Sequence, residues 1–335
     1  MLEDQRSPHP SKALLLAAFG SVYFFWGATF LAIRFAIETL PPFFMAGTRH
    51  FVAGVILYVW SRLRGAPRPT GAHWKSAAVV GVLLLCVGNG GVVWSEQRVP
   101  SGIAALMVAT IPLWMVLLSW LWHRSPRPGL GLSIGLVMGF VGTAMLVVPS
   151  GGAGGGHVDP LSAVVLMVAS ISWAGGSLYS RRAHLPPSPL LATAMEMLAG
   201  GALLLVMGGA TGEWTRLHLE ALSARSFLAL IYLITFGSLV GFTAYIWILR
   251  VSTPAHVSTY AYINPVIAVL VGRAFAGEPL TLRTLLSTAV IVTAVVLITT
   301  FRAKEAGVTS KEALLPAEEC PALPDEVFPQ LRKSD

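Results

Sequence analysis

Apolar runs of about twenty residues recur along most of this chain, and they limit its fold more than any other feature. A helix needs about 20 apolar residues to cross about 30 Å of hydrocarbon. The pattern therefore predicts an all-α integral membrane protein with ten transmembrane helices. Their approximate bounds are Ala13–Ile33, Pro42–Ser61, Ser76–Trp94, Ser101–Trp122, Gly129–Val148, Leu161–Ser180, Pro189–Met207, Phe227–Leu249, Ala255–Phe275 and Leu282–Phe301.

The composition agrees with a membrane protein. Of 335 residues, 55% are hydrophobic and 12% are charged, and the mean hydropathy is +0.70. A soluble domain carries about 25% charged residues. The net charge of +7 comes from short basic clusters between apolar runs, which is typical of membrane flanks, so no nucleic-acid partner is expected.

Neither a cofactor nor a metal site is expected. The two cysteines, Cys86 and Cys320, stand far apart and indicate no disulfide framework and no zinc spacing. A phosphate-binding G-x-x-x-x-G-K-[ST] loop is absent from the sequence, so ATP hydrolysis by this chain is not expected. Energy for any transport would come from a gradient.

Basic residues set the orientation. Most Lys and Arg of the connecting segments share a side with the N-terminus. The opposite segments hold only Arg34, Arg98, Arg216, Arg225, Arg273 and Arg283. The positive-inside rule therefore predicts that both termini are cytoplasmic. The first run lacks a small-residue cleavage site at a suitable place, so we interpret it as a retained helix.

The chain also repeats itself at two nearly equal spacings. The first spacing pairs Trp26 with Trp173, Arg34 with Arg181, Pro42 with Pro189, and Gly54 with Gly201; the second pairs Gly88 with Gly241, Trp94 with Trp247, Pro112 with Pro265, and Pro126 with Pro279. Two copies of a five-helix unit must cross the membrane in opposite directions. Such inverted repeats are typical of secondary transporters, whose substrate sites lie between the halves.

The predicted organisation follows from this repeat. A cytoplasmic N-terminus (1–12) precedes a first repeat of five helices (13–149). A Gly-rich linker (150–159) leads to a second repeat of five helices (160–301). A polar cytoplasmic tail (302–335) is expected to be disordered.

Three stretches carry a resemblance to a known family. They read "WGATFLAIRFAIETLPPFFMAGTRHFVAG", "PSGIAALMVATIPLWMVLLSWL" and "YAYINPVIAVLVGRAFAGEPLT". The chain resembles the bacterial EamA family of the drug/metabolite transporter superfamily, and the first two stretches are most similar to its drug/metabolite exporter subgroup. The resemblance implies ten helices and export of small metabolites, amino acids or drugs across the inner membrane. In such proteins the tenth span tends to be glycine-rich. Here it reads "LSTAVIVTAV", which questions close packing of that helix.

Arg49 is the first candidate for the substrate site. It lies about 12 Å inside the second span, where an unpaired charge costs about 2.5–3.5 kcal/mol, so it is expected to face the bundle interior. The repeat places Glu196 at the matching position of the seventh span. We expect both side chains to face a central cavity, coupled through water or substrate. The alternative is a structural ion pair that fixes two helices.

Aromatic and polar residues within the spans supply further candidates. Trp26 and Trp173 lie deep enough to form a cavity wall, and Tyr260 precedes Asn264–Pro265 in the ninth span. Asn89 lies in "GNGG", where the backbone can bend. Asn264 is expected either to satisfy a carbonyl that Pro265 leaves free or to bind substrate; small polar side chains often serve packing alone.

Two carboxylates are candidates for proton coupling, and a glycine stripe is a candidate for helix packing or assembly. Glu196 and Glu96 are the proposed proton carriers, although a cluster such as Glu96–Gln97–Arg98 is more often a solvated helix end. Gly131, Gly135 and Gly139 form a small-residue stripe on the fifth span. It favours close packing within the monomer, with a homodimer as the alternative.

The function that best fits these features is secondary transport of a small-molecule substrate by alternating access, in the direction of export. The chain is expected to be a multi-pass protein of the bacterial inner membrane, in contact with membrane lipid. A lipid-carrier flippase of the same fold remains an alternative. An integral-membrane enzyme acting on lipid is a weaker one, because no H-E-x-x-H motif and no Ser/His/Asp grouping in a wet loop is present. A cavity with one Arg, a Glu and aromatic residues suits zwitterions such as amino acids, and also many drugs.

Overall fold

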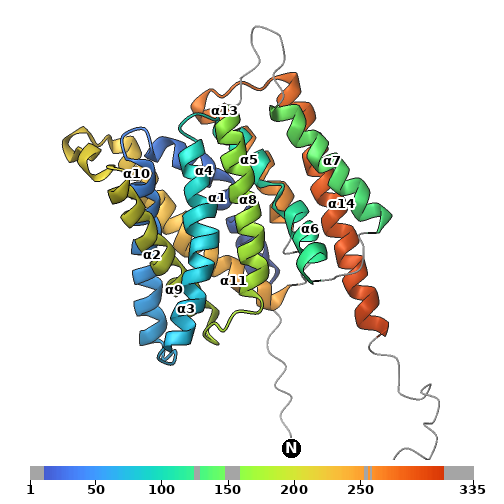
Figure 1. The fold of residues 1–335 in the computed structure, drawn as a ribbon, viewed down its shortest axis with the longest axis horizontal. Coiled ribbons are helices and arrows are strands. Elements are labelled where there is room, and N and C mark those ends of the chain that lie inside the picture. Colours follow the sequence, from blue (N-terminus) through green and yellow to red (C-terminus); the bar gives the residue numbers. More distant parts are fainter. Residues whose placement is uncertain (1–10, 124–128, 148–158, 253–255, 257–258, 313–335) are drawn as a thin grey trace, which may run out of the picture.

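The computed structural model describes residues 11–123, 129–147, 159–252, 256 and 259–312, and within them every regular element is a helix (Figure 1). Most of the Gly-rich linker and the tail beyond residue 312 lie outside the described residues. The first half contains α1 (Lys12–Ala36), α2 (Pro42–Leu63), α3 (Gly71–Gly81), η1 (Val82–Asn89), α4 (Gly90–Ser95), α5 (Ser101–Val108), α6 (Ile111–His123) and α7 (Leu130–Val147). The second half contains α8 (Pro160–Ser180), α9 (Pro189–Ala210), η2 (Trp214–Arg216), η3 (Leu219–Ala221), α10 (Ala224–Tyr232), η4 (Leu233–Val240), α11 (Gly241–Val251), α13 (Tyr260–Ala276) and α14 (Leu282–Glu312).

The predicted all-helical membrane fold is confirmed. In the described residues, nine helices are long and apolar enough to cross a membrane, and Tyr260–Ala276 is a shorter apolar helix. The residues at the helix starts explain where the helices begin. The first turn of a helix tolerates proline, and a side-chain oxygen just before it can accept a hydrogen bond from the free backbone N–H groups. α8 begins at Pro160 behind the capping side chain of Asp159, and α9 begins at Pro189 behind that of Ser188.

The two halves interlock. α1 of the first half packs on α11 and α13 of the second, while α8 of the second half packs on η1, α5 and α6 of the first. Equivalent helices also meet each other, α2 with α9 and α7 with α14. Each half therefore buries its first helix in the other half, so that the inverted repeats form a single bundle.

Tryptophan–glycine contacts show the repeat at atomic scale. A Cβ added at Gly241 would lie 2.4 Å from Nε1 of Trp26, and one added at Gly88 would lie 3.0 Å from a ring carbon of Trp173. The two tryptophans and the two glycines are the pairs that the sequence spacings matched. The same packing therefore occurs twice, each time between a tryptophan of one half and a glycine of the other.

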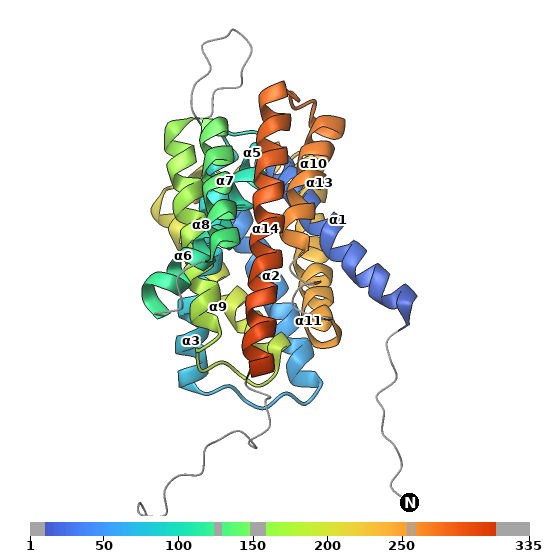
Figure 2. The ribbon, with the colours of Figure 1, turned by 90° about the vertical axis from the view of Figure 1, so that its right-hand side faces the viewer.

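Figures 1 and 2 show α7 and α14 side by side at one flank of the bundle. The glycine stripe on α7 serves this packing. Gly131 faces Phe301 and Gly135 faces Ile298, both on α14, while Gly139 faces Leu113 on α6. The expected packing within the monomer is confirmed. The glycines that bring α14 close lie on its partner helix, so α14 packs closely without glycines of its own.

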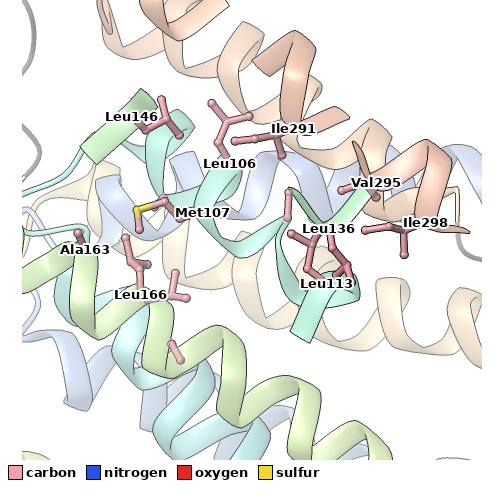
Figure 3. Close-up of a cluster of buried hydrophobic side chains, with 14 of the residues drawn as sticks. Leu106, Met107, Leu113, Leu136, Leu146, Ala163, Leu166, Ile291, Val295 and Ile298 are labelled. Carbon is pink, nitrogen blue, oxygen red and sulfur yellow. The ribbon is translucent and has the colours of Figure 1, made fainter. Parts of the chain in front are cut away.

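A large apolar core joins this flank to the rest of the bundle (Figure 3). It draws buried residues from α4, α5, α6, α7, α8, α13 and α14. Its labelled members are Leu106, Met107, Leu113, Leu136, Leu146, Ala163, Leu166, Ile291, Val295 and Ile298.

The third and eighth spans each contain an eight-residue π-helical segment, η1 and η4. Such segments often occur at functional sites, because the wider turn leaves some backbone groups without their usual partners. The fourth span is broken between α5 and α6, just before Pro112, whereas α13 continues through Pro265.

α1 begins and α14 ends at the same end of the bundle, the lower end in Figures 1 and 2. We call the opposite end the distal end. α14 continues to Glu312, where disorder was predicted from residue 302. The segment Arg302–Glu312 contains Ala, Lys, Glu and Arg, which are good helix formers, so the helix continues past its apolar part.

Candidate functional site

Arg49 lies on α2, at the boundary between the repeats. It is 4% exposed, which confirms that it faces the interior. Its Nε donates to the Oγ of Ser238 in η4 at 3.0 Å. Over the described residues, this is the only hydrogen bond of the guanidinium, and it forms no ion pair within 4.0 Å. The terminal nitrogens therefore keep the donor geometry that binds a carboxylate through two parallel hydrogen bonds.

Gly237 supplies the room that Arg49 needs. A Cβ at Gly237 would lie 3.0 Å from Nη2 of Arg49. The repeat places Leu84 and Leu85 where the second half has Gly237 and Ser238. A polar space for a guanidinium therefore exists in only one half. Sequence reasoning missed Gly237 and Ser238, although aligning the halves at the second repeat spacing would have found the difference.

Glu196 does not meet Arg49 in this structure. It is partly buried on α9, and its backbone carbonyl oxygen would lie 2.6 Å from a Cβ added at Gly81 of α3. No hydrogen bond or ion pair joins its side chain to Arg49 or to any other group in the described part of the chain. The structural ion pair considered above is not present there.

Glu96 is a second buried carboxylate whose charge acts on Arg49. It follows α4 directly, is 4% exposed, and interacts electrostatically with Arg49. The reading of this cluster as a solvated helix end is therefore wrong for Glu96, although Gln97 and Arg98 are exposed. Neither carboxylate oxygen of Glu96 has a hydrogen-bond partner within the described ranges.

Glu278 ties three parts of the distal end together. Its Oε1 accepts hydrogen bonds from Nη1 of Arg34 at 3.0 Å and from the backbone N and the Oγ of Ser101, both at 2.8 Å. Its Oε2 accepts from the backbone N of Gly102 at 3.0 Å. We call these four residues the Glu278 clasp. Sequence reasoning missed it, because its members are far apart in the chain.

Four aromatic rings gather beside the Arg49 site. The ring centroid of Trp26 lies 5.3 Å from that of Phe242, 5.1 Å from that of Tyr245 and 5.4 Å from that of Tyr260. Nε1 of Trp26 donates to the carbonyl of Gly237 at 3.1 Å, so this aromatic cluster adjoins the residue that makes room for Arg49. Trp26 and Tyr260, both candidates from the sequence, lie in contact in this cluster.

The other candidates have separate surroundings. Trp173 of the second half packs over Gly88 of the first half. Oδ1 of Asn89 lies 3.0 Å from Nε2 of the buried His50. Asn264 is 8% exposed, and its amide nitrogen, oriented toward acceptors, donates to the carbonyls of Tyr260 at 3.3 Å and Tyr23 at 3.1 Å. Asn264 therefore uses its amide within the protein in this conformation.

The described residues contain no cluster of three or more His, Cys, Asp or Glu side chains that could hold a metal ion. The groups that they do bring together are a guanidinium, a carboxylate and aromatic rings. Groups of these kinds can bind and orient charged organic molecules. Arg49 and Glu96 are both almost fully buried, so neither side chain is accessible from outside the protein in the described conformation.

A family model described as the EamA-like transporter family matches residues 12–148 and 160–300, one match in each half. The chain is 42% identical over 289 residues to the uncharacterized inner membrane transporter YedA of Escherichia coli (strain K12), covering 85% of this chain and 90% of that protein. It is 26% identical to the uncharacterized transporter YvbV of Bacillus subtilis (strain 168), covering 88% of this chain and 93% of that protein.

A solved crystal structure of a protein shares the fold. The TM-score is 0.59 at 19% identity, over 88% of this chain and 99% of that chain. The matches support a multi-pass transporter of the inner membrane. With a family model covering both repeats and a 42% identical relative matched over most of its length, the chain belongs to the EamA-like transporter family.

Proposed function

We propose that this chain is a secondary transporter that exports small organic solutes bearing a carboxylate, amino acids among them, by alternating access. The observation that carries the proposal is the state of Arg49. Arg49 is 4% exposed and lies between the repeats. Within the described residues, its guanidinium donates a hydrogen bond only through Nε. Burial of a cation at this depth is costly, and a solute carboxylate is the ligand that best satisfies the free donors.

The neighbouring groups support the rest of the solute. The aromatic cluster offers ring faces and edges to an apolar side chain, and aromatic faces also attract ammonium groups. Glu96, which acts electrostatically on Arg49, can neutralise a second, positive charge. The site residues proposed for binding are thus Arg49, Trp26 and Tyr260. Asn89, Asn264, Trp173 and Glu196 are proposed as secondary contacts in other conformations.

Counterflow in proteoliposomes tests the proposal. Purified protein is loaded with each member of a panel of amino acids, carboxylates without amines and amines without carboxylates. Exchange is expected only for solutes with a carboxylate. The solute should emerge unmodified, since an enzyme would change it.

Two substitutions at Arg49 sharpen the test. Arg49→Gln is expected to reduce exchange by at least about tenfold, and Arg49→Lys to reduce it less, because lysine keeps the charge but not the bidentate geometry. The matched control is Arg98→Gln, which removes an exposed cation stacked on Trp94 and should leave exchange unchanged. Parental exchange by Arg49→Gln would refute Arg49 as the substrate anchor.

A further inference from the structure

Glu96 differs from the other buried carboxylates at the distal end in its hydrogen bonding. Glu278 accepts four hydrogen bonds, and Glu213 accepts two from the backbone nitrogens of Phe43 and Phe44. Glu96 is as buried as they are, yet its oxygens have no hydrogen-bond donor among the described groups. An ionised carboxylate buried without donors costs several kcal/mol, whereas a protonated one costs far less.

Glu96 and Glu278 also share one cation. The charges that act on Glu96 are those of Glu278, which repels it, and of Arg34 and Arg49, which attract it. Arg34 already donates to Glu278 at 3.0 Å. Two neighbouring carboxylates resist simultaneous ionisation. Because Glu278 already holds Arg34 and the donors of α5, whereas Glu96 has no donor in the described residues, the described conformation suits a Glu96 that carries a proton.

The Glu278 clasp closes the distal end between the repeats. Arg34 ends α1, and Ser101 and Gly102 begin α5, all in the first repeat, whereas Glu278 lies in the second repeat between α13 and α14. A helix N-terminus favours a carboxylate, since its first backbone N–H groups are otherwise unpaired. Movement of the repeats apart at this end therefore requires the clasp to break.

We propose that Glu96 is the proton-binding group of the transport cycle and that its deprotonation opens the distal end by drawing Arg34 away from Glu278. The proton leaves Glu96 for solvent at the distal end. The new carboxylate takes Arg34 as a partner, and Glu278 loses its ion pair with Arg34. Reprotonation of Glu96 returns Arg34 to Glu278 and closes the clasp. The inference rests on the proposed function, because it assigns the coupling ion of the same transporter.

The elements packed against Glu96 bring few other titratable groups. α2 contributes Arg49 and His50, of which His50 pairs with Asn89. η1 contributes the thiol of Cys86, and α8 carries no Asp, Glu, Lys, Arg or His along its length. Together with Arg34 and Glu278, these are the groups that could compete for the proton, and Glu96 is the only one that combines a carboxyl group with a lack of donors.

Labelling of a buried cysteine tests the switch without requiring a substrate. Ala105→Cys lies one helical turn after Ser101 on the same face of α5, and Ala105 is 1% exposed. The full chain carrying Cys86→Ser and Cys320→Ser is purified in detergent. Maleimide labelling rates are measured from about pH 5.5 to about pH 8.5 and normalised to SDS-unfolded protein at each pH. The rate is expected to rise with pH, by at most about tenfold per unit because one proton is released.

Variants assign the effect. Glu96→Gln mimics the protonated side chain and should label slowly at every pH, whereas Arg34→Gln and Glu278→Gln should label fast at every pH. Glu38→Gln is the matched control, since Glu38 forms the partly exposed ion pair with Arg225 at 3.2 Å, and it should keep the parental profile.

Three results would overturn the proposal: a flat profile in the parent, an unchanged pH profile in Glu96→Gln, or slow labelling of both clasp variants. The first of these does not depend on whether the Glu96, Arg34 and Glu278 variants fold. If labelling follows pH as expected while no solute exchanges in counterflow, the switch stands and the proposed function fails. If exchange occurs but labelling ignores pH, the reverse holds.

Discussion

At the scale of single residues, the position of Arg49 depends on one glycine, which leaves space for the guanidinium, and on one serine hydroxyl, which accepts its hydrogen bond. Arg49 fits between the repeats because Gly237 has no Cβ, and it is oriented because Ser238 accepts its Nε hydrogen. A hydrogen bond to a charged group contributes about 1.5–3 kcal/mol. The hydroxyl therefore fixes the direction in which the terminal nitrogens point.

Ser238→Ala should weaken binding of a carboxylate solute by about tenfold or more, because Arg49 loses the hydrogen bond that orients its guanidinium. The measurement is the apparent KM in counterflow. The matched control is Ser287→Ala, which removes a fully buried hydroxyl that has no partner in the described residues and should leave KM unchanged. Equal KM values for both variants and the parent would show that Ser238 does not orient Arg49.

At the scale of elements, glycines set how closely the equivalent helices approach. On α9, a Cβ at Gly201 would lie 2.6 Å from the backbone nitrogen of Phe51 on α2, and one at Gly47 of α2 would lie 2.8 Å from the backbone nitrogen of Leu205 on α9. Backbone atoms cannot move aside as a side chain can. The α2–α9 crossing therefore depends on small residues, as helix pairs in membranes often do.

Gly201→Ala should lower the free energy of unfolding by about 1–3 kcal/mol, because the added methyl group overpacks the crossing. Thermal unfolding in detergent measures the change as a lower Tm. Gly20→Ala on α1 is the matched control. No heavy atom lies within 4 Å of its added Cβ, so better helix propensity should leave Tm equal or higher. A parental Tm for Gly201→Ala would mean that the crossing tolerates wider spacing.

At the scale of the whole molecule, the halves depend on each other. α1 and α8 each pack on helices of the opposite repeat, so neither repeat completes its own packing. The same exchange brings Arg49 of one repeat to Ser238 of the other, and Arg34 of one repeat to Glu278 of the other. Site and clasp thus both lie at the boundary where rocking of the repeats would act.

A chain cut within residues 150–159 tests this dependence. Residues 1–154 and 155–335 expressed together should co-purify and retain exchange, since their contacts need no covalent link. Each half expressed alone should be degraded or aggregate, because its first helix lacks a partner. Size-exclusion chromatography after affinity purification of one half measures the outcome. A stable, monodisperse first half on its own would contradict interlocking.

Prediction from the sequence succeeded where counting along the chain suffices. Helix length, the inverted repeat and the inward position of Arg49 all follow from the spacing of apolar and charged residues. It did not find the direct contact of Arg49. Matching depth suggested Glu196, with which Arg49 shares no hydrogen bond or ion pair in the described residues, whereas Nε of Arg49 donates to Oγ of Ser238.

The sequence by itself determined that this protein is an all-helical membrane protein built from two inverted repeats, because the number of apolar residues and the rise per residue fix which helices can cross a membrane. Only the tertiary structure decided which side chains face one another across the copies. The rotation of each helix about its axis, and the choice of neighbour, depend on packing all helices at once. For this reason Glu278, whose four donors come from α1 and α5, could be recognised only in the folded chain.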